Sequence, residues 1–149
     1  MFNMNPYLLN YLIINTLFVI VIGAVIALGI ISLVLHKETK KYDLKGVKTP
    51  VGKFPTAMIL SAIILPLVHL AYHTGLMVFF LIKAKAAEDA AMTEYVAIYL
   101  IVYFAEAILL ALLFVLIRNV YIQKKKLKEA KRLKIIADYE AQESGAKNE

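Results

Sequence analysis

Three long blocks of apolar residues, separated by short charged segments, constrain this chain more than any other feature. The first block, 7–35, contains no charged residue, and it exceeds the roughly 20 residues that a helix rising about 1.5 Å per residue needs to cross a bilayer. Two further blocks follow at 56–82 and 95–117. The blocks predict three transmembrane helices joined by short connectors.

The overall composition agrees with lipid as the main solvent. Of the 149 residues, 61% are apolar and 19% are charged, whereas an ordinary soluble domain has about 45–50% and about 25%. The chain has no cysteine, which excludes disulfides, thiolate metal sites and thiol nucleophiles. The expected fold class is therefore an all-α integral membrane protein.

Basic residues are distributed unevenly around the three blocks. No Lys or Arg precedes the first block, six lie between the first two, two lie between the last two, and nine follow from Arg118 onwards. Under the positive-inside rule this pattern places the first connector and the C-terminal tail in the cytoplasm and the N-terminus outside a plasma (inner) membrane. The net charge of +6 is then explained by orientation and by anionic lipid headgroups, so we expect no nucleic-acid partner.

The composition also suggests two parts, a transmembrane domain over 1–122 and a basic cytoplasmic tail over 123–149. Within the tail, apolar residues recur at helical spacing and predict a basic amphipathic helix. We expect this helix to fray after about position 140, because the last residues have little apolar content. The residues of the expected apolar face are Leu127, Ala130, Leu133, Ile136 and Ala137.

Small residues in the first block indicate where another helix can approach. Gly23 and Ala27 are four residues apart and therefore share one helix face, as in the small-xxx-small pattern of packed membrane helices. The partner helix can belong to this chain or to other integral membrane subunits. Ordinary membrane composition explains the pair equally well.

A few polar residues lie inside the apolar blocks, where ionisable groups are costly and usually face protein or a water-filled cavity. His69 and His73, at positions i and i+4, share one face of the second helix, and Glu106 lies near the middle of the third. Counting depth at about 1.5 Å per residue brings these three side chains into one layer, together with Asn15 from the first helix and Tyr103 on the face of Glu106. We expect a polar intramembrane cluster.

Three interpretations of this cluster stay open. It can be structural, with hydrogen bonds that hold the helices together in lipid. It can be a proton-exchange or quinone-side site, in which Glu106 exchanges protons with a neutral histidine. It can also hold haem or a metal ion, since His69, His73 and Glu106 resemble a two-histidine, one-carboxylate ligand set.

No hydrolase, kinase or dinucleotide-binding motif is present, so we do not expect an independent enzyme. Long apolar faces, buried polar groups and the lack of a soluble catalytic domain favour a small accessory or structural subunit of a larger, energy-transducing membrane complex, respiratory or ion-translocating. Two alternatives remain. One is a haem- or metal-binding anchor subunit, and the other is an oligomeric pore, because the topology resembles that of holins.

Overall fold

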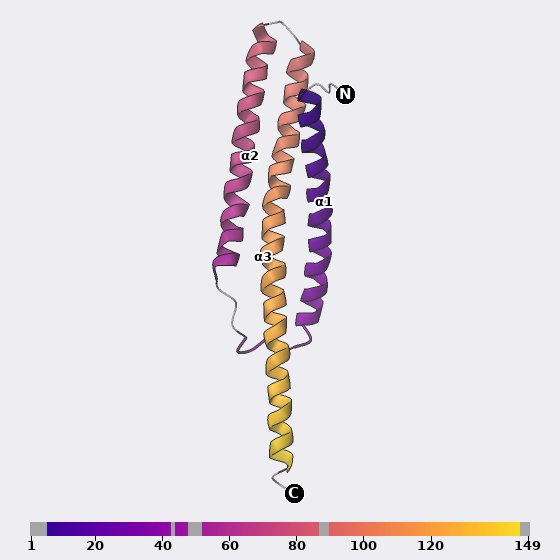
Figure 1. The fold of residues 1–149 in the computed structure, drawn as a ribbon, viewed down its shortest axis with the longest axis vertical. Coiled ribbons are helices and arrows are strands. Elements are labelled where there is room, and N and C mark those ends of the chain that lie inside the picture. The colour runs from indigo at the N-terminus through magenta and orange to yellow at the C-terminus, as the bar shows by residue number, and fades with distance from the viewer. Residues whose placement is uncertain (1–5, 43, 48–51, 87–89, 147–149) are drawn as a thin grey trace.

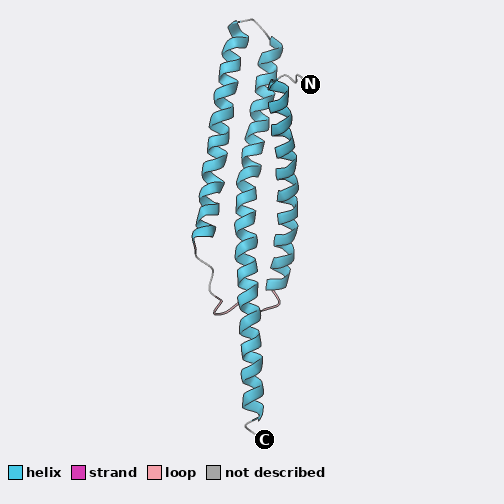
Figure 2. Cartoon of the chain, in the orientation of Figure 1, coloured by secondary structure: helices cyan, strands magenta, loops and turns pink. Residues whose placement is uncertain are grey.

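The computed structural model describes residues 6–42, 44–47, 52–86 and 90–146. These residues form three helices, α1 (Pro6–Thr39), α2 (Lys53–Ala86) and α3 (Ala90–Ala146), which run side by side in Figure 1. No strand occurs in the described ranges, and the described residues between α1 and α2 are turns and loops (Figure 2). All three helices are long and apolar enough to cross a membrane, so the prediction of an all-helical chain with three candidate spans is confirmed.

The helices extend beyond the predicted apolar blocks. α2 begins at Lys53, before Pro55, although we expected the helix to start after this proline. Proline is tolerated in the first turn of a helix, where its missing N–H would have had no intrahelical partner. α2 also continues through Lys83 and Lys85, because lysine and alanine are good helix formers.

α3 is the central helix of the arrangement. Both α1 and α2 pack against α3, and among the described residues they do not pack against each other (Figure 1). The more extensive of the two packings is the one between α2 and α3. The molecule is therefore an open row of three helices and not a closed bundle.

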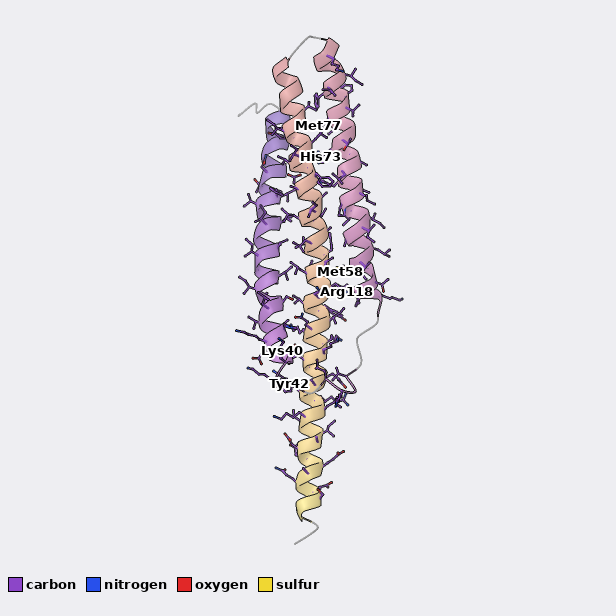
Figure 3. All side chains as sticks on the ribbon, turned by 180° about the vertical axis from the view of Figure 1, so that it is seen from behind. Lys40, Tyr42, Met58, His73, Met77 and Arg118 are labelled. Carbon is purple, nitrogen blue, oxygen red and sulfur yellow. The ribbon has the colours of Figure 1, made fainter. Side chains whose placement is uncertain are left out.

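The small apolar core lies between α2 and α3. Met77, Val96 and Tyr103 are buried there, and Phe80, Leu81 and Tyr99 pack around them. The labelled side chains of His73 and Met77 lie between the two helices in Figure 3. Most other large apolar side chains are exposed, and the most apolar stretch of α1 has no buried residue. Such surfaces require lipid or another protein around them.

α3 continues without a break past position 122 and through the basic segment to Ala146. Of the expected apolar face, Leu127 and Ala130 are buried, whereas Leu133, Ile136 and Ala137 are exposed. The end of α3 projects beyond the other two helices in Figure 1. Helix thus extends further than the expected fraying point near 140, because alanine, glutamine and glutamate at 141–143 are strong helix formers.

Candidate functional site

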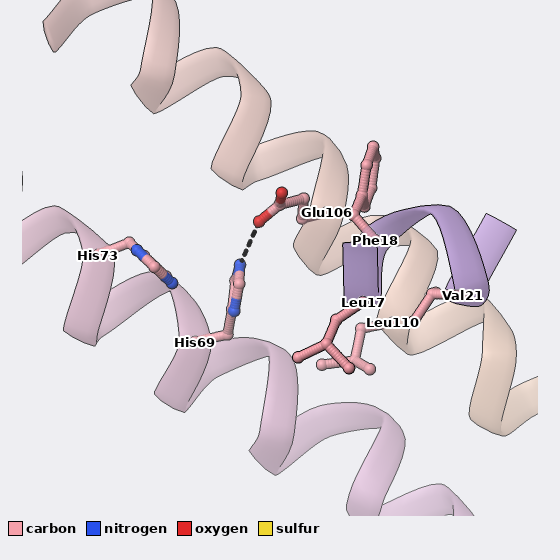
Figure 4. Close-up of a pocket in the computed structure, with 7 residues that line it drawn as sticks. All are labelled: Leu17, Phe18, Val21, His69, His73, Glu106 and Leu110. Carbon is pink, nitrogen blue, oxygen red and sulfur yellow. Dashed lines mark hydrogen bonds and ion pairs between the residues drawn. The ribbon is translucent and has the colours of Figure 1, made fainter. Parts of the chain in front are cut away.

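An interhelical hydrogen bond lies near the middle of the apolar segments. Nε2 of His69 on α2 is 3.1 Å from Oε2 of Glu106 on α3, as the dashed line in Figure 4 marks. His69 is roughly equidistant from Lys53 and Lys83, about 24 Å from the first and about 21 Å from the second along a helix that rises about 1.5 Å per residue. The bond therefore lies near the centre of the segment that these lysines bracket.

The two side chains of this pair differ in their exposure. Glu106 is buried, with only 6% of its side chain exposed, whereas 23% of the His69 side chain is exposed. A carboxylate can accept a hydrogen bond from an N–H of either neutral or protonated imidazole, and a protonated carboxyl can instead donate to an unprotonated ring nitrogen. The pair can therefore shift one proton across the bond without changing its total charge.

His73 lies one turn beyond His69 on the same face of α2 and is almost completely buried, with 6% exposed. Its ring stacks on that of Tyr103 at a centroid distance of 4.0 Å and an interplanar angle of 20°. The His69 and His73 rings are also close, with centroids 4.5 Å apart. The i, i+4 spacing on α2 therefore brings both imidazoles against α3, as expected.

One ring nitrogen of His73 has no protein partner. Nδ1 is buried and makes no hydrogen bond. A buried donor or acceptor left without a partner costs about 1–3 kcal/mol, so such atoms are uncommon in folded proteins. Two other described side-chain atoms, Nε of Arg118 and Oε1 of Gln123 on α3, have the same status, so this nitrogen is not by itself evidence for a ligand.

A cavity of about 320 Å³ adjoins the cluster. Side chains from all three helices line it, with the polar ones on one side and the apolar ones on the other (Figure 4). The lining residues are Leu17, Phe18 and Val21 of α1, His69 and His73 of α2, and Glu106 and Leu110 of α3. The cavity is therefore an apolar space with a polar wall that can exchange protons.

The structure brings together most of the predicted cluster. His69, His73, Glu106 and Tyr103 adjoin one another, and the rings of His69 and Tyr103 have centroids 6.2 Å apart. Asn15 is half-buried but does not line the cavity, so its part in the cluster stays a prediction.

Sequence reasoning did not identify the four apolar lining residues. The position of Leu110 could have been predicted, because it lies four residues after Glu106 and therefore on the same face of α3. The positions of Leu17, Phe18 and Val21 could not have been predicted, because α1 is apolar on all sides and its pattern does not show which side faces α3.

The residues of the cluster do not form an evident metal site. Across the described ranges, no group of three or more His, Asp or Glu side chains is placed to hold a metal ion. Nε2 of His69 is engaged with Glu106, and the His73 ring lies flat on Tyr103. The geometry therefore does not fit the two-histidine, one-carboxylate set, and we derive no chemistry through a metal.

The predicted helix-packing pair of α1 is not used within the chain. Gly23 and Ala27 are exposed, and a Cβ added to Gly23 would meet no atom within 4 Å. At about 100° per residue, these two positions lie roughly opposite the face of α1 that carries Leu17, Phe18 and Val21. The small residues therefore lie on an outer surface of the molecule, away from the cavity.

The candidate site thus consists of the His69–Glu106 pair, the buried His73 stacked on Tyr103, and the adjoining cavity. No family model, curated protein sequence or solved structure matches the chain.

Proposed function

We propose that this chain is a small integral subunit of a larger energy-transducing complex of the plasma (inner) membrane, in which the His69–Glu106 pair exchanges protons. The supporting observation is the 3.1 Å contact between two ionisable side chains in the middle of apolar segments, next to a cavity. Ionisable residues at such depth are costly and commonly belong to proton relays or ligand sites. The subunit itself need not be catalytic.

The uncovered surface of the molecule supports a role within an assembly. Among the described helices, α1 packs against α3 and not against α2, and its outer face carries Gly23 and Ala27. Small residues on a membrane helix permit close approach of a second helix, which gains van der Waals contacts that lipid tails do not provide as well. The proposed partner is a transmembrane helix of another integral subunit, docked on this face.

The proposed orientation follows from the distribution of basic residues. The connector between α1 and α2 and the end of α3 carry most of the Lys and Arg residues and would face the cytoplasm, with the N-terminus outside. The basic end of α3 would then lie near anionic lipid headgroups. Its apolar residues Leu133 and Ile136 are exposed and suited to contact the membrane surface or a partner.

Extraction of the tagged chain in a mild detergent tests this function. We expect a stable set of integral membrane proteins to co-purify, and Glu106→Gln should preserve this set but lower the turnover of the complex. Glutamine keeps the shape and a hydrogen bond to His69 but cannot exchange a proton. Failure of the variant to assemble would instead assign Glu106 a structural role.

The same preparations address the pore alternative. Vesicles that contain the purified chain alone should retain an entrapped dye, because a subunit that docks through one helix face need not form an aqueous channel. Leakage of the dye from these vesicles, without any co-purifying subunit, would contradict the proposed function and favour a holin-like pore.

A further inference from the structure

We propose that the guanidinium group of Arg118 on α3 binds the phosphate of an anionic phospholipid, near the end of the helix pair where α2 begins. The site is distinct from the His69–Glu106 pair, and the inference does not rest on the proposed function. Lipid binding by the purified chain requires neither a partner subunit nor turnover of a complex, so it can be measured separately.

Arg118 carries a positive charge for which the neighbouring helices supply no counter-charge. An arginine side chain stays protonated in proteins. α2 contains no acidic residue, and the nearest acids on α3 are Glu106, twelve residues earlier, and Glu129, eleven residues later. Both of these acids have other partners, His69 for Glu106 and Arg132 for Glu129. An anion from outside the chain is therefore the natural partner of Arg118.

The side chain of Arg118 is held beside the start of α2. Three residues further along α3, the ring of Tyr121 lies against Phe54 of α2, with centroids 4.7 Å apart. Residues at i and i+3 share one side of a helix, and Arg118 lies at the level of Met58 of α2 in Figure 3. Nε of the half-buried Arg118 is enclosed by protein, whereas its two terminal nitrogens are not. Only these terminal nitrogens can reach a ligand.

The depth of Arg118 matches the level of lipid phosphates. Arg118 follows Glu106 by twelve residues, or about 18 Å along a helix that rises about 1.5 Å per residue. The His69–Glu106 pair lies near the centre of the apolar segments, and half of a hydrocarbon core of about 30 Å is about 15 Å. Toward this centre α3 carries the exposed side chains of Val115 and Phe104, both within about 60° of Arg118 around the helix. The acyl chains of a lipid held at Arg118 would lie along these two side chains.

The surrounding charge selects an anionic headgroup. Lys125 lies one turn beyond Tyr121, with Nζ 5.7 Å from the centroid of that ring, and the exposed Lys53 is the first residue of α2. These cations repel the ammonium group of a zwitterionic headgroup and attract a headgroup such as phosphatidylglycerol. The planar guanidinium can donate two parallel hydrogen bonds to phosphate oxygens. Inorganic phosphate has the same oxygens but no acyl chains to keep it at the edge of the hydrocarbon.

Nitrogen-15 NMR of the arginine side chains tests the site directly. Arg118 and Arg132 are the only arginines of the chain, and the Arg132 side chain is 71% exposed, so it serves as an internal control. We would place the full chain, labelled on arginine, in phosphatidylcholine nanodiscs and increase the fraction of phosphatidylglycerol. The Arg118 signals should shift and saturate at a low fraction of phosphatidylglycerol, with no saturating shift of Arg132. Inorganic phosphate added to phosphatidylcholine nanodiscs should shift neither.

Variants separate this site from general attraction to a charged membrane. Native mass spectrometry would compare the lipids retained by the chain from micelles with equal amounts of phosphatidylglycerol and phosphatidylcholine. Arg118→Gln should weaken retention of phosphatidylglycerol about tenfold or more, as expected for loss of a hydrogen-bonded charge. Arg118→Lys keeps the charge but not the paired donors, and should retain an intermediate amount. Arg132→Gln removes the same charge from an exposed position and should retain as much as the wild type.

The proposal is overturned if Arg118 and Arg132 respond alike to phosphatidylglycerol, if inorganic phosphate shifts Arg118 as strongly, or if Arg118→Gln retains the lipid like the wild type. If the glutamine variant does not fold, Arg118→Lys decides: reduced retention supports the site, and unchanged retention contradicts it. Failure of the proposed function gives a different result. Full turnover in Glu106→Gln together with specific retention of phosphatidylglycerol would remove the proton-exchange role and keep the lipid site.

Discussion

His69 and Glu106 form a hydrogen bond of 3.1 Å that joins the middle of α2 to the first third of α3. The two residues are 37 positions apart in the chain and meet because α2 and α3 run antiparallel across a connection of a few residues. The bond has a structural consequence as well as a chemical one, since the open row of helices has only a small apolar core.

A double-mutant cycle should detect this bond as a coupling between the two positions. We expect His69→Ala and Glu106→Ala each to destabilise the chain, and the double variant to lose less than the sum by about 0.6 to 2 kcal/mol. Reversible unfolding in mixed detergent micelles measures the three free energies of unfolding. Strict additivity would mean that the contact contributes nothing to the fold.

The stack of His73 on Tyr103 predicts that the size and aromaticity of residue 73 matter for packing. Because the ring centroids are 4.0 Å apart, His73→Ala should lose about 0.5–1.5 kcal/mol of aromatic interaction in addition to the burial of the ring. His73→Phe should retain most of that stability. Val68→Ala, at a position 59% exposed on the same helix, serves as the control and should change the stability little. Equal losses in His73→Ala and His73→Phe would argue against a packing role.

The open space around Gly23 predicts that larger side chains there disturb the partner and not the chain. Gly23→Leu combined with Ala27→Leu should leave the unfolding of the isolated chain nearly unchanged and should reduce recovery of the co-purified subunits. Gly75→Leu is the matched control, since a Cβ on Gly75 of α2 also meets nothing within 4 Å. Full recovery of partners with the α1 double variant would exclude this face as the docking surface.

The lack of cysteine makes the orientation easy to test. Single cysteines at Asn3, Lys45, Lys85 and Ser144 would each be the sole thiol of the chain. A membrane-impermeant maleimide should label positions 3 and 85 in intact cells, and positions 45 and 144 only after the membrane is opened. The reverse pattern would contradict the positive-inside assignment.

The sequence was sufficient to predict the three helices, because long uncharged blocks have few alternatives in lipid. It also predicted the contact layer of His69, His73, Glu106 and Tyr103, because helical spacing and the rise per residue fix both face and depth. Face and depth depend only on local helix geometry, whereas the contact itself also requires the antiparallel packing of α2 on α3.

Other features depend on tertiary packing and were missed. The rotation of α1 could not be predicted, since its apolar residues surround the helix, and so Leu17, Phe18 and Val21 were not identified as cavity-lining residues. The predicted apolar spans do not give the helix ends, because hydropathy selects apolar residues while helix propensity continues past them. α3 therefore continues from the third span to Ala146, beyond the expected fraying point near 140.

The most direct test of the account is the rate at which the His69 ring N–H exchanges with bulk water, measured by NMR in nanodiscs for the wild type and for Glu106→Gln. We predict exchange in the wild type and slower exchange in the variant, because a carboxyl group can pass a proton across the hydrogen bond and an amide cannot. Equal exchange rates in the two chains, or no exchange in either, would contradict the proposed proton-exchange site.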